Sequence, residues 1–410
     1  MLLSALACAA IAFSLAVRAQ AQTESVLYSF SGAADGALPN GGLISDGAGN
    51  LYGTAFAGGD LSVCGGGGCG VVYKLSPSSN GWTETVLHTF SGGDGANPSA
   101  GLIFDAKGNL YGTTSAGGRF TCQGDGCGVI FQLSPTSSGW KEKVLYNFGG
   151  TSDGSAPTFP LTFDAAGNLY GVAQSGGNTT NCSGFSYGCG VAFKLWHESS
   201  GWSFQALYVF SDADSSGPAS GFLLDARGNL FGTGTYASGV VYELSPTASK
   251  TWKDIVIYYF TEPIGYSPQG LVFDAEGNLY GPTVYGGTGG GIIDCEDKQP
   301  GCGTVFKLSR GSGGWTESAL HEFTGADASP LGSLVFDAAG NLYGTDSVEV
   351  FELSRGSNGG WTKTALHTFA GAGDGKDPRG SLLLDKADDI FGVTLAGGFS
   401  GAGTVFEIAP

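Results

Sequence analysis

A series of aspartates recurs at one place in a repeated chain and offers the most direct chemistry. Most of them precede a glycine and follow a strand-like run that ends in Phe. The six members are Asp35, Asp94, Asp153, Asp214, Asp327 and Asp374. A ring of carboxylates would suit Ca²⁺ or a cationic group. An Asp-Gly pair is equally typical of a turn closed by the Asp side chain, so both interpretations stay open.

A second series lies just downstream and changes residue type from repeat to repeat. Each member directly follows a proline, so the surrounding chain is constant while the side chain differs. The series reads Asn40, Ser99, Thr158, Ala219, Gln269, Leu331 and Arg379. A variable side chain on a constant frame is where ligand contacts would be encoded. The alternative is that these side chains merely face solvent.

Cysteines form four local pairs, each at the same place in its repeat: Cys64/Cys69, Cys122/Cys127, Cys182/Cys189 and Cys295/Cys302. Locally paired cysteines in an exported chain are typical of disulfides. Zinc is the alternative, but two thiolates without a nearby His would leave half of the coordination shell empty. We therefore predict four disulfides, each closing a short loop and contributing roughly 2 kcal/mol.

Catalytic motifs are missing from the sequence. It contains no Ser/His/Asp arrangement, no phosphate-cradling glycine loop and no metal-binding His spacing. His88, His321 and His367 occupy a position that Tyr fills in other repeats, which favours packing over catalysis. The sequence thus names no catalytic residue, no metal ligand and no cofactor other than the possible Ca²⁺.

The elements that would position these residues are set by a cassette of the form Asp, two or three residues, Asn-Leu-Tyr-Gly. Its seven copies begin at Asp46, Asp105, Asp164, Asp225, Asp274, Asp337 and Asp385, and the last copy is degenerate. A period of about fifty to sixty residues is typical of a propeller or a repeat array. Each cassette predicts a hairpin between two short apolar strands, with Asp and Asn as turn residues.

Two further strands complete each repeat, and the second of them runs from a Trp to a Phe eight residues later, as in Trp140 and Phe148. Four antiparallel strands make one propeller blade. The segment 26–30 matches a fourth strand and the segment 404–408 a third strand. We therefore predict an all-β, seven-bladed β-propeller over residues 22–410, closed by pairing the N-terminal strand with the last blade, which leaves no open edge.

Beyond this pattern, the chain resembles the GloVer tandem-repeat family of exported bacterial proteins. The resemblance rests on Asn-Leu-Tyr-Gly-Thr, Gly-Val-Val-Tyr-Lys-Leu-Ser-Pro, Gly-Trp-Thr-Glu-Thr-Val-Leu-His-Thr-Phe and the Gly-Gly-x-Asp-Gly loop. It covers nearly all of the chain after residue 21. It implies a repeat fold and export, but it implies no activity.

Charge and the N-terminal segment narrow the cellular context. The formal net charge is −18 at pH 7, which repels phosphate backbones and argues against nucleic acid binding. Residues 1–21 are expected to be a secretory signal, because the apolar run 2–17 is too short for an anchor and Ala19-Gln20-Ala21 is typical of a cleavage site. We expect a secreted or periplasmic monomer without a membrane span after cleavage near Ala21.

Three functions are compatible with this sequence. The favoured one is a non-enzymatic propeller that binds a partner or a glycan through the long, disulfide-closed loops, since rigid scaffolds present function on loops. The second is a carbohydrate-active enzyme, a lyase or hydrolase, that uses the aspartate ring with Arg379. The third is a structural protein of the cell surface.

Overall fold

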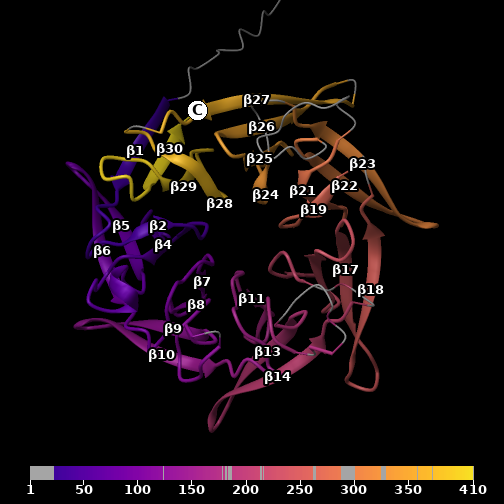
Figure 1. Cartoon of the computed structure of the whole chain (residues 1–410). Coiled ribbons are helices and arrows are strands. Elements are labelled where there is room, and N and C mark those ends of the chain that lie inside the picture. The colour runs from indigo at the N-terminus through magenta and orange to yellow at the C-terminus, as the bar shows by residue number, and fades with distance from the viewer. Residues whose placement is uncertain are drawn as a thin grey trace, which may run out of the picture.

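The computed structural model describes residues 23–122, 124–177, 179–180, 182, 187–212, 215, 217–261, 265–287, 301–324, 329–357, 359–371 and 373–409. These residues form seven antiparallel sheets. The sheets stand around a central opening like the blades of a propeller (Figure 1). The predicted all-β, seven-bladed fold is confirmed.

Strand bounds follow the repeats closely, and the blades are numbered in chain order. Blade 1 has β2 (Ala37–Pro39), β3 (Ile44–Ser45), β4 (Leu51–Ala57), β5 (Val71–Ser78) and β6 (Gly81–Thr89). Blade 2 has β7 (Ile103–Phe104), β8 (Leu110–Thr114), β9 (Val129–Thr136) and β10 (Gly139–Asn147). Blade 3 has β11 (Thr162–Phe163), β12 (Leu169–Ala173), β13 (Val191–Glu198) and β14 (Gly201–Val209). Blade 4 has β15 (Leu223–Leu224), β16 (Leu230–Gly234), β17 (Val240–Pro246) and β18 (Trp252–Tyr259).

The remaining blades repeat this order from the centre outward. Blade 5 has β19 (Tyr266–Pro268), β20 (Val272–Phe273), β21 (Leu279–Tyr285), β22 (Thr304–Gly311) and β23 (Gly314–Glu322). Blade 6 has β24 (Leu331–Phe336), β25 (Leu342–Thr345), β26 (Glu349–Arg355) and β27 (Trp361–Thr368). Blade 7 has β28 (Lys376–Leu384), β29 (Ile390–Ala396), β30 (Thr404–Ala409) and β1 (Thr23–Ser29). A short 3-10 helix, η1 (Cys64–Gly66), lies in blade 1. Among the described residues, no helix is long and apolar enough to cross a membrane.

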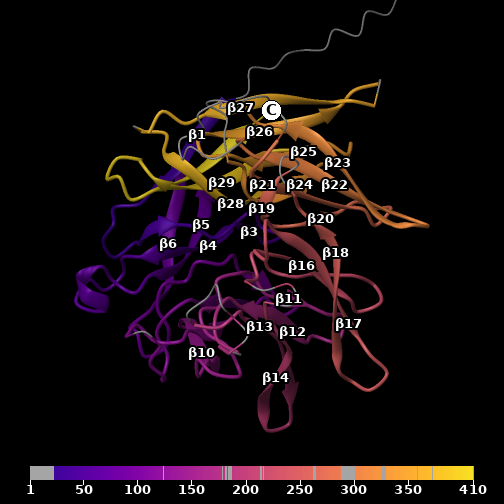
Figure 2. The ribbon, with the colours of Figure 1, turned by 45° about the vertical axis from the view of Figure 1, so that its right-hand side comes forward.

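Blade 7 closes the ring by combining both ends of the chain. β1 pairs antiparallel with β30, from Thr23 opposite Ala409 to Ser29 opposite Thr404. The indigo N-terminal strand lies beside the yellow C-terminal strands in both ribbon views (Figures 1 and 2). The predicted closure is therefore confirmed, and it gives blade 7 four strands.

The cassette is a hydrogen-bonded hairpin, as predicted. In blade 2, Asp105 Oδ1 accepts the backbone N–H groups of Lys107 at 2.8 Å and Asn109 at 2.9 Å. Its Oδ2 accepts the side-chain amide of Asn109 at 2.7 Å and the hydroxyl of Tyr111 at 3.1 Å. Burial by itself would raise the pKa of Asp105, but these hydrogen bonds outweigh burial, so the pKa lies below its ordinary value. The cassette thus fixes the turn and the second strand together.

The cassette glycine has a packing role in every blade. A Cβ on Gly112 would lie 2.6 Å from the ring of Phe131 on β9, and the six equivalent glycines face the same aromatic position. That ring also receives the terminal Phe of the preceding blade: the Phe90 and Phe131 centroids are 5.2 Å apart, edge to face. Neighbouring blades therefore pack against each other through buried aromatic pairs, which are stabilised by apolar burial and by the edge-to-face ring geometry.

Candidate functional site

The two faces of the ring carry different connections. We call the side with the cassette hairpins the hairpin face, and the side with the connections between second and third strands and between blades the loop face. All described disulfides and the described members of both candidate series lie on the loop face. This arrangement follows from four consecutive antiparallel strands per blade.

Three of the four predicted disulfides are confirmed, with Cα atoms 5.4 Å apart in Cys64–Cys69, 4.9 Å in Cys122–Cys127 and 5.6 Å in Cys182–Cys189. Cys302 is also disulfide-bonded, but its expected partner, Cys295, lies outside the described residues. Among the described residues, the group of possible metal ligands within reach of one another is Cys182, Cys189 and Asp212. Two of its three members are joined as a disulfide, so they are not available as thiolate ligands.

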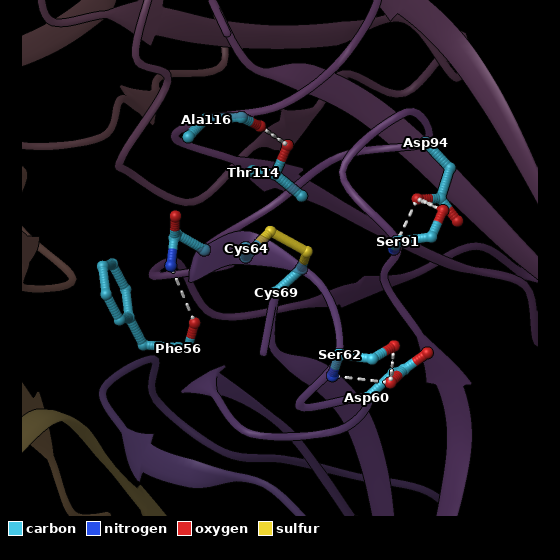
Figure 3. The surroundings of a disulfide bond; sticks show 10 residues. Phe56, Asp60, Ser62, Cys64, Cys69, Ser91, Asp94, Thr114 and Ala116 are labelled. Carbon is cyan, nitrogen blue, oxygen red and sulfur yellow. Dashed lines mark hydrogen bonds between the residues drawn. A yellow bond between two sulfur atoms is a disulfide. The ribbon is translucent and has the colours of Figure 1, made fainter. Parts of the chain in front are cut away.

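The disulfides connect two loops of the loop face. A Cβ added to Gly92, in the connection to the next blade, would lie 3.9 Å from Cys64 Sγ and 3.8 Å from Cys69 Sγ. In the next blade, a Cβ on Gly150 would collide with Cys122 Sγ. Figure 3 shows the first disulfide with the segment of Ser91 and Asp94 and the segment of Asp60 and Ser62 on one side of it. The disulfide therefore stiffens its own loop and supports the following one.

Large apolar side chains project from four loops in neighbouring blades. Each of these loops connects the second and third strands, in blades 7, 1, 2 and 3 in turn around the ring. The side chains and their exposed fractions are Phe399 (90%), Leu61 (45%), Phe120 (52%) and Tyr187 (54%). Exposed apolar side chains on neighbouring loops of one face are candidate contacts for a partner.

The variable series lies on the inner strands, toward the centre of the ring. The preceding proline is buried in each blade, and in six blades it packs on a glycine of the preceding blade, as Pro98 does on Gly70. Arg379 binds Asp377 through two nitrogens, each at 3.0 Å. All seven members are partly exposed: Asn40, Ser99, Thr158, Ala219, Gln269, Leu331 and Arg379. Their role as ligand contacts stays a prediction.

Sequence reasoning missed the conformation of the residue before each proline. This residue is left-handed in all seven blades: Leu38 (φ 56°), Asn97 (57°), Ala156 (52°), Gly217 (63°), Ser267 (58°), Ser329 (60°) and Asp377 (61°). Six of the seven are not glycine, although this region costs other residues about 1–2 kcal/mol. In blade 2, the N–H of Asn97 donates to the carbonyl of Cys69 at 2.8 Å. This hydrogen bond between neighbouring blades holds the residue in its left-handed conformation. The sequence gives no signal for that conformation, because the residue type before the proline varies from blade to blade.

The aspartate series lies near the outer strands, where each carboxylate closes its loop. Asp94 accepts the N–H of Ser91 at 2.8 Å and lies 3.0 Å from His88 Nε2. Asp153 accepts the Tyr146 hydroxyl at 3.0 Å, and Asp35 accepts the Tyr28 hydroxyl at 2.9 Å. Asp374 accepts the N–H of Ala370 at 2.8 Å and lies 3.4 Å from His367 Nε2. Burial alone would raise the pKa of Asp94, but the hydrogen bonds from His88 and Ser91 lower it overall. The turn interpretation accounts for these contacts; Asp214 and Asp327 lie outside the described residues.

A third set of carboxylates was not predicted from the sequence. Glu24, Glu84, Glu142 and Glu317 occupy one position of the outer strand, and in each case Oε1 is buried without a hydrogen-bond partner. Burial, reinforced by the neighbouring Asp35, raises the pKa of Glu84 to about 7. Burial also raises the pKa of Glu142 to about 7, with Asp94 adding to the shift and His88 opposing it. A Trp-x-Glu spacing, as in Trp82 and Glu84, is the signal that would have identified three of the four; Glu24 follows Gln22 instead.

Comparisons with known proteins agree with this architecture. The family model described as the Gloeobacter/Verrucomicrobia repeat matches residues 9–182 and 179–350. No curated protein matches the sequence.

Three solved structures show a similar fold. Virginiamycin B lyase from Staphylococcus aureus is 14% identical, with a TM-score of 0.55 over 95% of this chain and 99% of that chain. A streptogramin B lyase is 13% identical, with a TM-score of 0.56 over 94% of this chain and 97% of that chain. A periplasmic gluconolactonase from Pseudomonas aeruginosa is 17% identical, with a TM-score of 0.51 over 84% of this chain and 94% of that chain. At such low identity the likeness concerns the fold alone.

Proposed function

Because the chain belongs to the Gloeobacter/Verrucomicrobia repeat family and folds as a seven-bladed propeller, we propose that it is a non-enzymatic protein whose loop face binds a partner protein or a glycan. The observation that carries this proposal is the row of exposed apolar side chains on neighbouring loops, Leu61, Phe120, Tyr187 and Phe399. Large side chains on preorganised loops lose little conformational freedom on binding.

The structure of the loops supports a binding surface more than a catalytic one. The described aspartates hold their own loops, and the bonded carboxylates of Asp35 and Asp94 have lowered pKa values despite burial. A general acid needs a raised pKa to carry a proton at neutral pH. The formal charge of −18 favours a neutral or cationic ligand at this face.

We extend the proposal to location. The disulfides are typical of proteins outside the cytoplasm. The protein would then be secreted or periplasmic after removal of residues 1–21, and mass spectrometry of the exported protein tests this by its first residue.

A glycan array and a panel of exported proteins would test the binding function with Phe399→Ser and Phe120→Ser. Both side chains project from loops, so the variants should stay folded, and binding should fall at least about tenfold for each. The matched control is Ile255→Ser, which removes an apolar side chain of 37% exposure from the outer strand β18.

The same protein should be incubated with polysaccharides and the products measured. Release of oligosaccharides by the native chain, lost in Arg379→Ala, would contradict a purely binding role and support the enzyme alternative. Unchanged binding by both Phe variants would reject the loop tips as the binding surface.

A further inference from the structure

A cleft of about 330 Å³ lies on the hairpin face between blades 2 and 3, opposite the proposed binding surface. Its wall is aromatic: Trp202 stands edge to face against Tyr111 at 6.0 Å and against His197 at 5.6 Å, and Phe163 lies beside Tyr111 at 5.2 Å. Polar groups complete the lining, namely Asp105, Lys107, Asn109, Gln132 and Lys143. Aromatic walls with a few polar groups are characteristic of small-molecule sites.

Most polar atoms of the wall are already paired, which makes the wall rigid. Asp105 accepts four hydrogen bonds within its hairpin, and Tyr111 accepts the amide of Gln132 at 2.7 Å. The exposed ammonium groups of Lys107 and Lys143, by contrast, form no ion pair with any described carboxylate. These two groups are therefore available to a ligand.

The equivalent cleft between blades 5 and 6, of about 390 Å³, carries a different charge. Glu276 stands there in place of Lys107, and Arg355 pairs with Trp361 as His197 pairs with Trp202. Lys307, which replaces Gln132, is bound 3.7 Å from Asp274 and lies over the Tyr280 ring at 5.1 Å. The residues that line the first cleft include two cations and one carboxylate, whereas those that line the second include three carboxylates and Arg355, with Lys307 held by Asp274 outside the lining.

We propose that the cleft between blades 2 and 3 binds an acidic saccharide. The apolar face of a sugar ring would lie against Trp202, and a uronate carboxylate would pair with Lys107 and Lys143. A local excess of positive charge on a chain of net charge −18 selects an anionic ligand. The volume lies at the low end for ligand pockets, so about one or two sugar rings fit. This site is independent of the loop face.

Titration calorimetry and Trp fluorescence with digalacturonate test the proposal, using the neutral digalactoside for comparison. Digalacturonate should bind at least about tenfold more tightly than the digalactoside, and binding should weaken with added salt. The variant Lys107→Glu/Lys143→Ser gives the cleft the residues of its counterpart, since Ser318 replaces Lys143 there. It should lose at least about tenfold in affinity.

The control is Lys141→Ala, which removes an exposed ammonium group from the same strand, β10, outside the cleft lining. Its affinity should equal that of the native chain. Equal binding of the neutral disaccharide, or full affinity in the double variant, would overturn the proposal. Binding of inorganic sulfate as tight as that of digalacturonate would reduce the site to a general anion site and also overturn it. Retention of loop-face binding in the double variant would show that the two sites are separate.

Discussion

The imidazole Nε2 of His88 lies 3.0 Å from Oδ2 of Asp94, in the place where other blades have a tyrosine hydroxyl. Tyr146 donates to Asp153 at the same distance, 3.0 Å. We therefore expect His88→Tyr to change the free energy of unfolding by less than about 0.5 kcal/mol at pH 7. Asp94→Ala should lose about 1–3 kcal/mol, because Ser91 and His88 lose their acceptor. Urea unfolding measures both, and a large loss in His88→Tyr would show that the loop requires imidazole.

The contribution of Asp94 to the free energy of unfolding should decrease at low pH. Its pKa in the folded state lies below the ordinary value of 3.8, so its stabilising effect is present above that value and is lost as the pH falls through the folded pKa. The difference in stability between the native chain and Asp94→Ala should therefore shrink below about pH 4. A constant difference down to pH 2 would contradict this assignment.

Glu142 should make the protein less stable as the pH rises. Burial raises its pKa from 4.5 to about 7 in the folded state, so the folded chain retains a proton that the unfolded chain has lost. The free energy of unfolding therefore decreases as the pH rises from 4.5 to about 7 and stays constant, as far as this group is concerned, above pH 7. Glu142→Gln should match the native chain near pH 4 and exceed it by about 1 kcal/mol at pH 8. The exposed Glu276→Gln is the control, and equal pH profiles for Glu142→Gln and the native chain would reject the shift.

A single substitution in the degenerate cassette of blade 7 should increase the stability of the protein. Asp389 stands where the other blades have Asn, and burial together with Asp385 and Asp388 raises its pKa. Asp389→Asn should restore the bond that Asn109 donates to Asp105 at 2.7 Å and add about 1 kcal/mol at pH 7. The reciprocal Asn109→Asp should lose a similar amount. Denaturant midpoints measure both, and a loss in Asp389→Asn would contradict the proposed repulsion.

The left-handed residues before the prolines predict opposite effects when the residue types of two blades are interchanged. Ala156 has a φ of 52°, and its counterpart in blade 4 is Gly217 with a φ of 63°. Ala156→Gly should gain about 0.5–1 kcal/mol by relieving the strain, whereas Gly217→Ala should lose about 1–2 kcal/mol. Thermal unfolding checks the opposite signs, and equal signs would show that chain entropy or packing outweighs the strain.

Removal of one disulfide should loosen a loop and leave the ring intact. In Cys64→Ser/Cys69→Ser, we expect a loss of roughly 2 kcal/mol and faster protease cleavage near η1. Near-ultraviolet circular dichroism should keep its native shape, because the aromatic pairs between blades do not depend on the loop. Loss of that spectrum would contradict a core formed by the blades alone.

The fold was predictable because each blade repeats the same local sequence signals, so a degenerate copy can be recognised by comparison with the other six. The Asp105 hairpin, the Trp140-to-Phe148 strand and the ring closure all followed from spacing. The candidate sites were less accessible. The pairing of Asp94 with His88, six residues apart, depends on side-chain orientations that the repeat spacing does not specify. The charge of the two clefts depends on which side chains of neighbouring blades line them and on which atoms are already bonded.

The pairing of β1 with β30 has a consequence in time. The strand made first during synthesis must wait for the strand made last, since Thr23 pairs with Ala409. Contacts between such distant segments form slowly, because a long loop must close first. Until then β1 presents an unpaired edge that can join a strand of another chain. We therefore expect ring closure to be the slowest step of folding, and two growing chains that meet in this interval would be open to exchanging their first strands.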